Sequence, residues 1–209
     1  MRTDVKTVMK LFAVVGAIAL AAVVTLAGTE GGDGRALRRD AELLRQKVAA
    51  IASHAERPNK PLRRTTVTEN EVNAYLVYEA LDQLPSGVVE PTVRILGTGR
   101  VSGRAVVDLD AVRKQRNSAS LLDPASYLTG RLPVTAAGVL TTTNGVGQFA
   151  LESASVGGVP IPKFLLQEIV SYYSKTADKP AGISLDDPFA LPARIREIRV
   201  ERGQAIIIQ

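Results

Sequence analysis

The chain has 209 residues, of which 45% are hydrophobic, with a formal net charge of +5 and no cysteine. The lack of cysteine excludes disulfides, thiol nucleophiles, thiolate metal sites and lipid modification of a cysteine. Part of the small positive surplus belongs to the first ten residues. Because nucleic-acid-binding proteins concentrate basic residues in patches, we expect no nucleic-acid partner.

An apolar run over residues 11–28 follows a short basic leader, residues 1–10. A helix of this length measures about 27 Å, close to the roughly 30 Å hydrocarbon core of a bilayer. The basic leader favours a cytoplasmic N-terminus. We therefore predict a single-pass transmembrane anchor in the inner (cytoplasmic) membrane, with the rest of the chain extracytoplasmic, in the periplasm. A cleaved secretory signal is the alternative, because residues 25–27 form a passable cleavage site.

Residues 29–34 are rich in glycine and predict a flexible linker. Residues 35–64 are expected to form a proximal helix, Arg35 to Glu56, followed by a basic connector with two prolines. The helix is either a packing helix with one buried stripe or a short stalk or dimerising coil. Its apolar stripe consists of Leu37, Leu44, Val48 and Ile51.

The main domain, residues 65–209, opens with a strong helix-start signal. Thr68 and Glu71 form a capping box, in which the hydroxyl and the carboxylate each accept from a backbone amide of the first turn. The helix is therefore expected to begin at Glu69 and to end before Pro85. Its buried face would include Val72, Leu76, Ala80 and Leu84.

Beyond Gly87 the apolar period changes from about 3.6 residues to 2, as it does in half-buried strands. This alternation predicts three hairpins, over residues 93–109, 132–156 and 195–208. The turn of the second contains Asn144-Gly145, the strongest short-range hairpin signal. We expect the hairpins to build an antiparallel sheet.

Residues 111–130 separate the first two hairpins and predict an ordered insertion. An insertion of this kind can cover a sheet edge or contact a membrane. Its basic cluster, the candidate contact to a lipid headgroup or membrane, is Arg113, Lys114 and Arg116.

A second helix is predicted from Lys163 to about Lys175, opened by Pro160 and Pro162. Apolar side chains occupy well over half of its circumference, so it must be covered on more than one side. Either it is buried in a concave sheet, or part of its surface lines an apolar cavity for a ligand. Its narrow polar stripe consists of Lys163, Gln167, Ser171 and Ser174.

Catalytic signals are weak throughout the sequence. The single histidine, His54, cannot form a two-histidine metal site, and we expect it on the helix surface. No Gly-x-Ser-x-Gly nucleophile motif occurs. The pairs Asp108/Asp110 and Asp186/Asp187 are expected to be solvated loop charges. We therefore predict no enzyme, no metal and no cofactor.

Three stretches carry a family resemblance: TENEVNAYL at 68–76, LESASVGGVPIPKFLL at 151–166 and LPARIREIRVERGQAIII at 191–208. They resemble bacterial extracytoplasmic domains related to the tubular lipid-binding (TULIP-like) and AsmA-like proteins. The resemblance implies an α+β fold, with a curved antiparallel β-sheet wrapped around one or two long helices and an apolar groove for a lipid acyl chain. Because the chain is short, a half-open groove is expected instead of a closed tunnel. No catalytic residue is carried over.

The expected function is that of a membrane-anchored, non-enzymatic envelope protein that binds a membrane lipid or another apolar ligand between sheet and helix. The alternative is a structural or scaffolding module whose core is filled and whose surface binds another envelope protein. The candidate lining residues are Leu76 and Ala80 from the first helix, and Phe164, Leu165, Ile169 and Tyr172 from the second.

Overall fold

The computed structural model describes residues 33–57, 61–80, 84, 87–111, 130–173, 180–182 and 184–209, without the side chains of Asp33, Ile169, Tyr172 and Tyr173. The predicted anchor and the basic cluster Arg113, Lys114 and Arg116 lie outside the described residues. Within the described ranges, no helix is long and apolar enough to cross a membrane.

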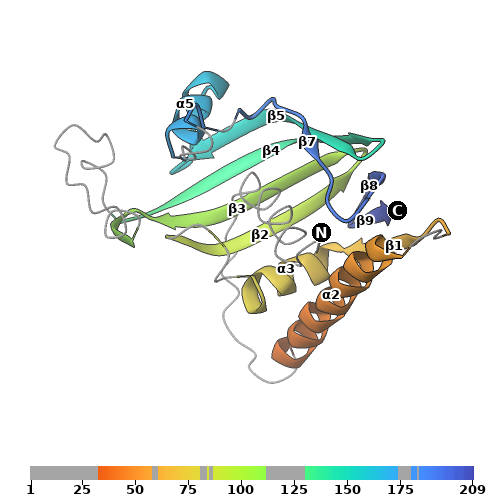
Figure 1. Cartoon of the computed structure of the whole chain (residues 1–209). Coiled ribbons are helices and arrows are strands. Elements are labelled where there is room, and N and C mark those ends of the chain that lie inside the picture. Colours follow the sequence, from red (N-terminus) through yellow and green to blue (C-terminus); the bar gives the residue numbers. More distant parts are fainter. Residues whose placement is uncertain are drawn as a thin grey trace.

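The fold is α+β, with two antiparallel sheets (Figure 1). The larger sheet has the strand order β2-β3-β4-β5-β6, with β7 also paired to β5, and the smaller has the order β1-β9-β8. The strands are β1 (Arg64–Thr68), β2 (Val88–Gly97), β3 (Arg100–Asp108), β4 (Arg131–Thr143), β5 (Val146–Val156), β6 (Val159–Pro160), β7 (Phe189–Ala190), β8 (Glu197–Glu201) and β9 (Gln204–Ile208). The helices are α2 (Asp33–Glu56), α3 (Glu69–Tyr78) and α5 (Lys163–Tyr173).

All three predicted hairpins form, but they do not share one sheet. The β4–β5 turn has positive φ at both Asn144 and Gly145, as the Asn-Gly signal requires. The last hairpin, β8–β9, pairs instead with β1, in a register that joins Arg64 to Ile208 and Thr68 to Gln204. No strand was predicted over residues 64–68, because the pairing of β1 depends on a partner about 140 residues away in the chain.

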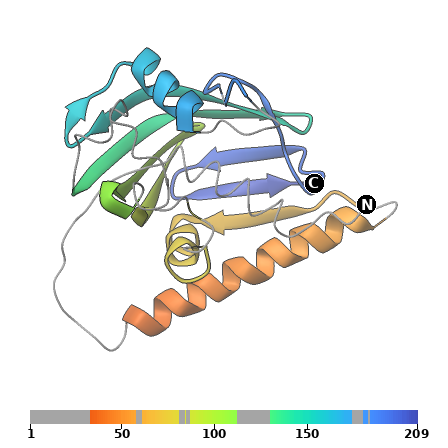
Figure 2. The ribbon, with the colours of Figure 1, turned by 60° about the vertical axis from the view of Figure 1, so that its left-hand side comes forward.

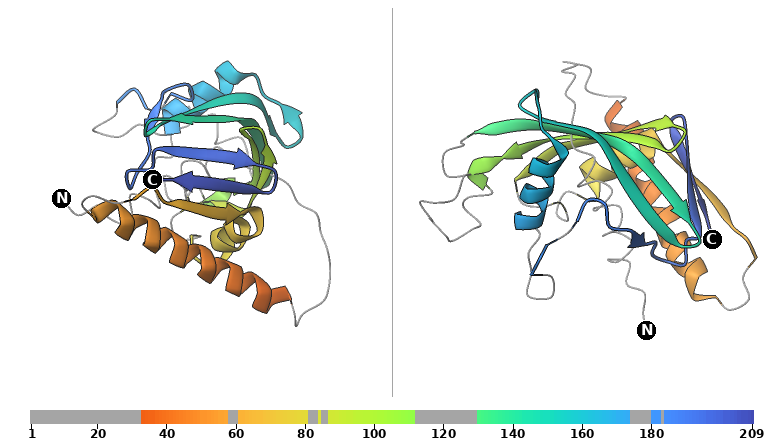
Figure 3. Two further views of the ribbon diagram at one scale, coloured as in Figure 1. Left: turned by 90° about the vertical axis from the view of Figure 1, so that its right-hand side faces the viewer. Right: turned by 90° about the horizontal axis from the view of Figure 1, so that it is seen from above.

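The larger sheet has one apolar and one polar face. Its pairings align Val93 with Gly103, Gly103 with Ala136, and Ala136 with Ala154, so apolar alternate residues of four strands share a face. On the other face the Thr135 and Ser155 hydroxyls lie 2.6 Å apart. The sheet forms an arch, with α5 beneath it (Figure 3, right). The apolar face is its inner face.

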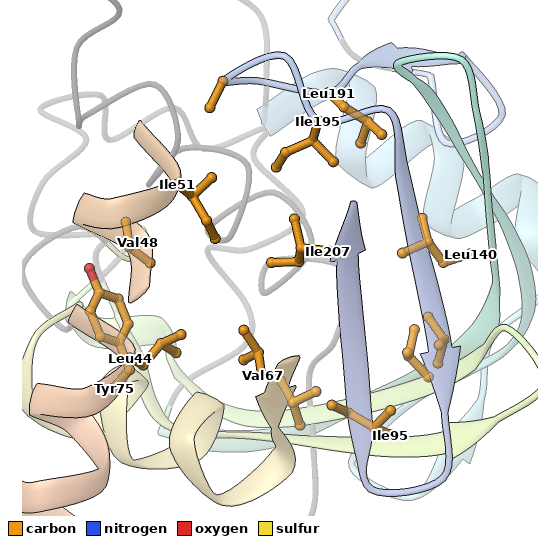
Figure 4. Close-up of a cluster of buried hydrophobic side chains, with 14 of the residues drawn as sticks. Leu44, Val48, Ile51, Val67, Tyr75, Ile95, Leu140, Leu191, Ile195 and Ile207 are labelled. Atoms are coloured by element: carbon orange, nitrogen blue, oxygen red, sulfur yellow. The ribbon is translucent and has the colours of Figure 1, made fainter. Parts of the chain in front are cut away.

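The hydrophobic core lies where both sheets meet α2 and α3 (Figure 4). Leu44, Val48 and Ile51 of α2 are buried there, as the predicted stripe requires. Leu37, the fourth predicted member, is 42% exposed. The core also contains Val67 of β1, Tyr75 of α3, Ile95 of β2, Leu140 of β4, Ile195, and Ile207 of β9.

The long helix α2 contacts α3 and β1 and lies outside the two sheets (Figure 2). The other described helices, α3 and α5, have only 10 and 11 residues. This arrangement differs from the expected single sheet around long helices. The long helix packs by one face, because its other face is charged and stays in solvent.

Candidate functional site

The predicted capping box at the start of α3 is present. The Glu71 amide donates to Thr68 Oγ1 at 3.2 Å, and the Thr68 amide donates to Glu71 Oε2 at 2.9 Å. Lys47 Nζ from α2 lies 2.6 Å from Glu71 Oε1 and also donates to the carbonyl oxygen of Thr66, at 2.7 Å. A buried carboxylate needs such a partner, so this cluster ties α2, β1 and α3 together.

Two further polar residues of α3 hold the edge of β2. Asn73 Nδ2 donates to the Val93 carbonyl at 2.9 Å, and the Val93 amide donates to Asn73 Oδ1 at 2.6 Å. The Ile95 amide donates to Glu69 Oε2 at 2.7 Å. These side chains form hydrogen bonds with backbone groups of β2 that would otherwise lack a protein partner at the edge of the sheet. Thr68, Glu69, Glu71 and Asn73 of the TENEVN stretch therefore serve the fold.

The structure places the predicted lining residues in two separate groups. Leu76 and Ala80 lie in the hydrophobic core, near the β2 edge of the larger sheet, which α3 contacts. Phe164 and Leu165 lie on α5, which contacts β5, near the opposite edge of that sheet. Their side chains are 72% and 44% exposed. Ile169 and Tyr172 belong to the same helix by their backbone.

The polar stripe of α5 is bound to a neighbouring segment, residues 184–187, which we call the strap. Lys163 Nζ lies 2.5 Å from Asp186 Oδ1, and the Leu185 amide donates to Gln167 Oε1 at 2.7 Å. Gln167 Nε2 also donates to Ser171 Oγ at 2.6 Å. The expectation that the apolar side of this helix is covered is not met at its first turn. There the polar side faces protein and the apolar side faces outward.

The inner face of the larger sheet continues beyond the hydrophobic core. We call this part the distal inner face; it consists of Val88, Val107, Leu132, Val134 and Val156, all half-buried. The small residues Gly103, Ala105, Ala136 and Ala154 lie between it and the core. The Ile161 amide donates to the Ala154 carbonyl at 2.9 Å, so α5 begins next to this face. The alternation predicted each strand but not that these residues form one surface.

Several titratable residues considered from the sequence have structural partners. Hydrogen bonds from the Ala111 amide and, to a smaller extent, from the Arg131 side chain hold the pKa of Asp108 below its usual value. Asp186 pairs with Lys163. His54 is 4% exposed, and its Nε2 lies 3.2 Å from the Pro61 carbonyl oxygen, so its expected surface position is wrong. The residues described contain no group of three or more side chains suited to a metal.

The sequence matches no known family and no curated protein. A solved structure, the crystal structure of lipopolysaccharide binding protein, is a weak structural match with a TM-score of 0.22 and 16% sequence identity. The match covers 70% of this chain and 40% of that protein, so the chain spans less than half of its length. A similarity of this size carries no argument about function.

Proposed function

We propose that this protein is a membrane-anchored, non-enzymatic envelope protein that binds a lipid or another apolar ligand between the larger sheet and α5, as TULIP-like domains do. The observation that carries the proposal is the orientation of α5. Lys163 and Gln167 of its polar stripe bind the strap, while Phe164 and Leu165 stay exposed on a helix that contacts β5 of the larger sheet.

An acyl chain suits such surroundings better than a polar ligand. Five aliphatic side chains of the distal inner face are half-buried, and the neighbouring positions are glycine or alanine, which leave the sheet surface flat. Each methylene that a ligand buries contributes about 0.8 kcal/mol. An acyl chain therefore needs no hydrogen bond from the protein to be held.

The anchor belongs to this proposal as well. Residues 11–28 would hold the domain at the extracytoplasmic side of the inner membrane, where lipid is present at high local concentration. If the segment is cleaved instead, the same domain is a soluble carrier.

One observation favours the alternative function, a scaffolding module with a filled core. Leu76 and Ala80, two of the predicted lining residues, are buried among core side chains of α2 and both sheets. In that function the exposed side of α5 binds another envelope protein instead of a lipid.

A single tryptophan tests the lipid site directly, because the natural chain contains none. The full chain carrying Phe164→Trp, purified in a non-ionic detergent, is titrated with a brominated fatty acid. If α5 lines the site, the bromine atoms quench the indole fluorescence at low fatty-acid concentration. Unlabelled fatty acid should reverse the quenching.

The matched control is Leu96→Trp, because Leu96 is also apolar and exposed but lies on β2, at the sheet edge opposite to α5. Its fluorescence should change little over the same titration. Equal quenching at both positions reports non-specific partition and contradicts the proposal. No quenching at position 164 favours the scaffolding function.

A further inference from the structure

The strap joins α5 to the edge of the larger sheet. On the side of the helix, Lys163 pairs with Asp186. The Leu185 amide donates to Gln167 Oε1 of the same helix. On the side of the sheet, Gln148 Nε2 of β5 donates to the Asp186 carbonyl at 3.3 Å, and the chain then continues into β7, which pairs with β5. The strap therefore bridges the helix and the strand.

The contacts with this part of the chain follow one side of α5. Lys163, Gln167 and Ser171 are four residues apart, so they lie one above the other on the helix. Gly182, two residues before the strap, lies against the third of them, because a Cβ atom at Gly182 would clash with the Ser171 carbonyl group. Three successive turns of α5 are thus held from the same side.

The rest of the domain holds α5 only weakly. No described side chain of this helix belongs to the hydrophobic core, and α5 lies far from α2 and α3 (Figures 1 and 2). Leu185 of the strap is buried, with 6% of its surface exposed, but it too lies outside that core. The position of α5 therefore depends on the strap and on the segment that leads into the helix.

That leading segment supplies a hinge. The Ile161 amide donates to the Ala154 carbonyl of β5, which fixes the chain up to this residue. The next carbonyl, that of Pro162, accepts from the Leu165 and Leu166 amides at 3.1 and 3.2 Å and so moves with the helix. Rotation about the link between Ile161 and Pro162 is enough to move α5, because a hinge needs only a few residues at the end of an element.

The attachment to the strap is open to solvent. The side chains of Lys163 and Asp186 are 46% and 59% exposed. Ion pairs at such exposure contribute little to stability and are screened by salt. These contacts can therefore open while the core stays folded, since a local opening breaks only the contacts of the segment that moves.

We propose that the strap is a releasable latch for α5. In the closed state, the contacts of Lys163 and Gln167 with the strap hold the helix beside β5. When these contacts break, α5 turns about the hinge and uncovers the space between itself and the larger sheet. Because that space is the ligand site of the proposed function, the latch rests on that function, and it controls how fast a lipid enters and leaves.

A covalent link across the latch tests this effect. The natural chain has no cysteine, so Lys163→Cys and Asp186→Cys introduce a single pair of thiols into the full chain. A bifunctional methanethiosulfonate reagent joins them, and a reductant releases them. With Phe164→Trp as the probe, association and dissociation of a brominated fatty acid should slow by about tenfold or more, because the link removes the open state. The reductant should restore both rates.

The matched control is the pair Arg100→Cys and Glu152→Cys. In the natural chain these two side chains also form an exposed ion pair, with their N and O atoms 2.9 Å apart. They lie on β3 and β5, so a link between them joins two strands and does not restrain α5. The control link should leave both rates unchanged. Equal slowing by the two links, or no slowing by the link across the latch, contradicts the proposal.

The movement of α5 is also measured without a ligand. Nitroxide labels on Glu168→Cys of α5 and Arg94→Cys of β2, both at exposed positions, report the distance between helix and sheet. The natural strap should give one main distance. Gln167→Leu combined with Asp186→Asn removes the strap's contacts with the helix side chains, and a second distance should appear. Salt should populate that distance in the natural strap as well, because it screens the ion pair of Lys163.

The two measurements separate the latch from the lipid site. If the two strap substitutions leave a single distance, the strap does not hold α5 and the latch is contradicted, whether or not fatty acid binds. If the second distance appears but fatty acid does not quench the tryptophan at position 164, the movement of α5 stands and the proposed ligand site fails. Hydrogen-exchange protection of β3 and β9, which contribute to the core, should stay at its natural level and shows that the variants are folded.

Discussion

At the scale of single residues, short polar side chains of α3 take the place of a neighbouring strand. Asn73 offers one donor and one acceptor with the spacing of a peptide group, and both are used by Val93 at the edge of β2. Glu69 accepts from Ile95 two residues later. At Val93 and Ile95 the edge of β2 therefore has no free backbone group to pair with a strand of another chain. These residues carry much of the TENEVNAYL resemblance, and they contribute to folding.

Replacing Asn73 by alanine should lower the free energy of unfolding by about 1–3 kcal/mol, because the amide and carbonyl of Val93 lose their partners. The control Asn70→Ala changes an exposed residue on the same helix and should stay within about 0.5 kcal/mol. Urea unfolding of the two variants measures the difference. Equal stability of both would show that water replaces Asn73 at no cost.

At the scale of elements, the first turn of α5 differs from that of an ordinary surface helix, because its apolar residues Phe164 and Leu165 are exposed. Such a helix normally buries its apolar stripe and exposes its polar one. Here Gln167 and Lys163 bind the strap, and Phe164 is exposed. The composition of the helix was evident in the sequence, but which of its sides meets the protein depends on the strap, whose position follows from the β5–β7 pairing.

Gln167→Leu should loosen the strap without unfolding the domain. The Leu185 amide loses its acceptor, a cost of about 1–3 kcal/mol, so its hydrogen exchange should accelerate by about tenfold or more. Glu168→Leu, at an exposed position one residue further, should leave that exchange unchanged. Hydrogen exchange followed by mass spectrometry resolves the strap. If both variants behave alike, Gln167 does not hold it.

At the scale of the whole molecule, one hydrophobic core joins α2, α3 and both sheets. Gln209 strengthens this connection, because its side-chain amide donates to the Ile51 carbonyl at 2.9 Å and to the Ala193 carbonyl at 2.8 Å. The proximal helix is thus packed into the domain along its second half. Its first turns, before Leu44, lie outside this core.

Ile51→Ala should therefore destabilise the entire domain. The side chain is fully buried, and its truncation costs about 2–5 kcal/mol. The hydrogen-exchange protection factors of β3, β9 and α3 should all fall, and by about the same factor in each of the three elements. Leu43→Ala, at an exposed position of the same helix, should have little effect. A loss of protection confined to α2 would mean that this helix is a separate unit.

The sequence by itself determined the local structure. The capping box, the Asn-Gly turn, the proline-opened helix and the alternating strands follow from interactions between residues close in the chain, and the structure confirms each of them. The buried stripe of α2 was likewise evident at Leu44, Val48 and Ile51, since a helical period needs only the helix itself.

The tertiary structure decided which elements meet. It paired β1 with β9, separated the hairpins into two sheets and buried His54 against Pro61. It also separated Leu76 and Ala80 from Phe164 and Leu165, which the sequence assigned to one groove; that lining remains a prediction. The physical reason is common to all of these. Periodicity shows that a face is apolar, whereas its partner is selected by packing between residues distant in the chain.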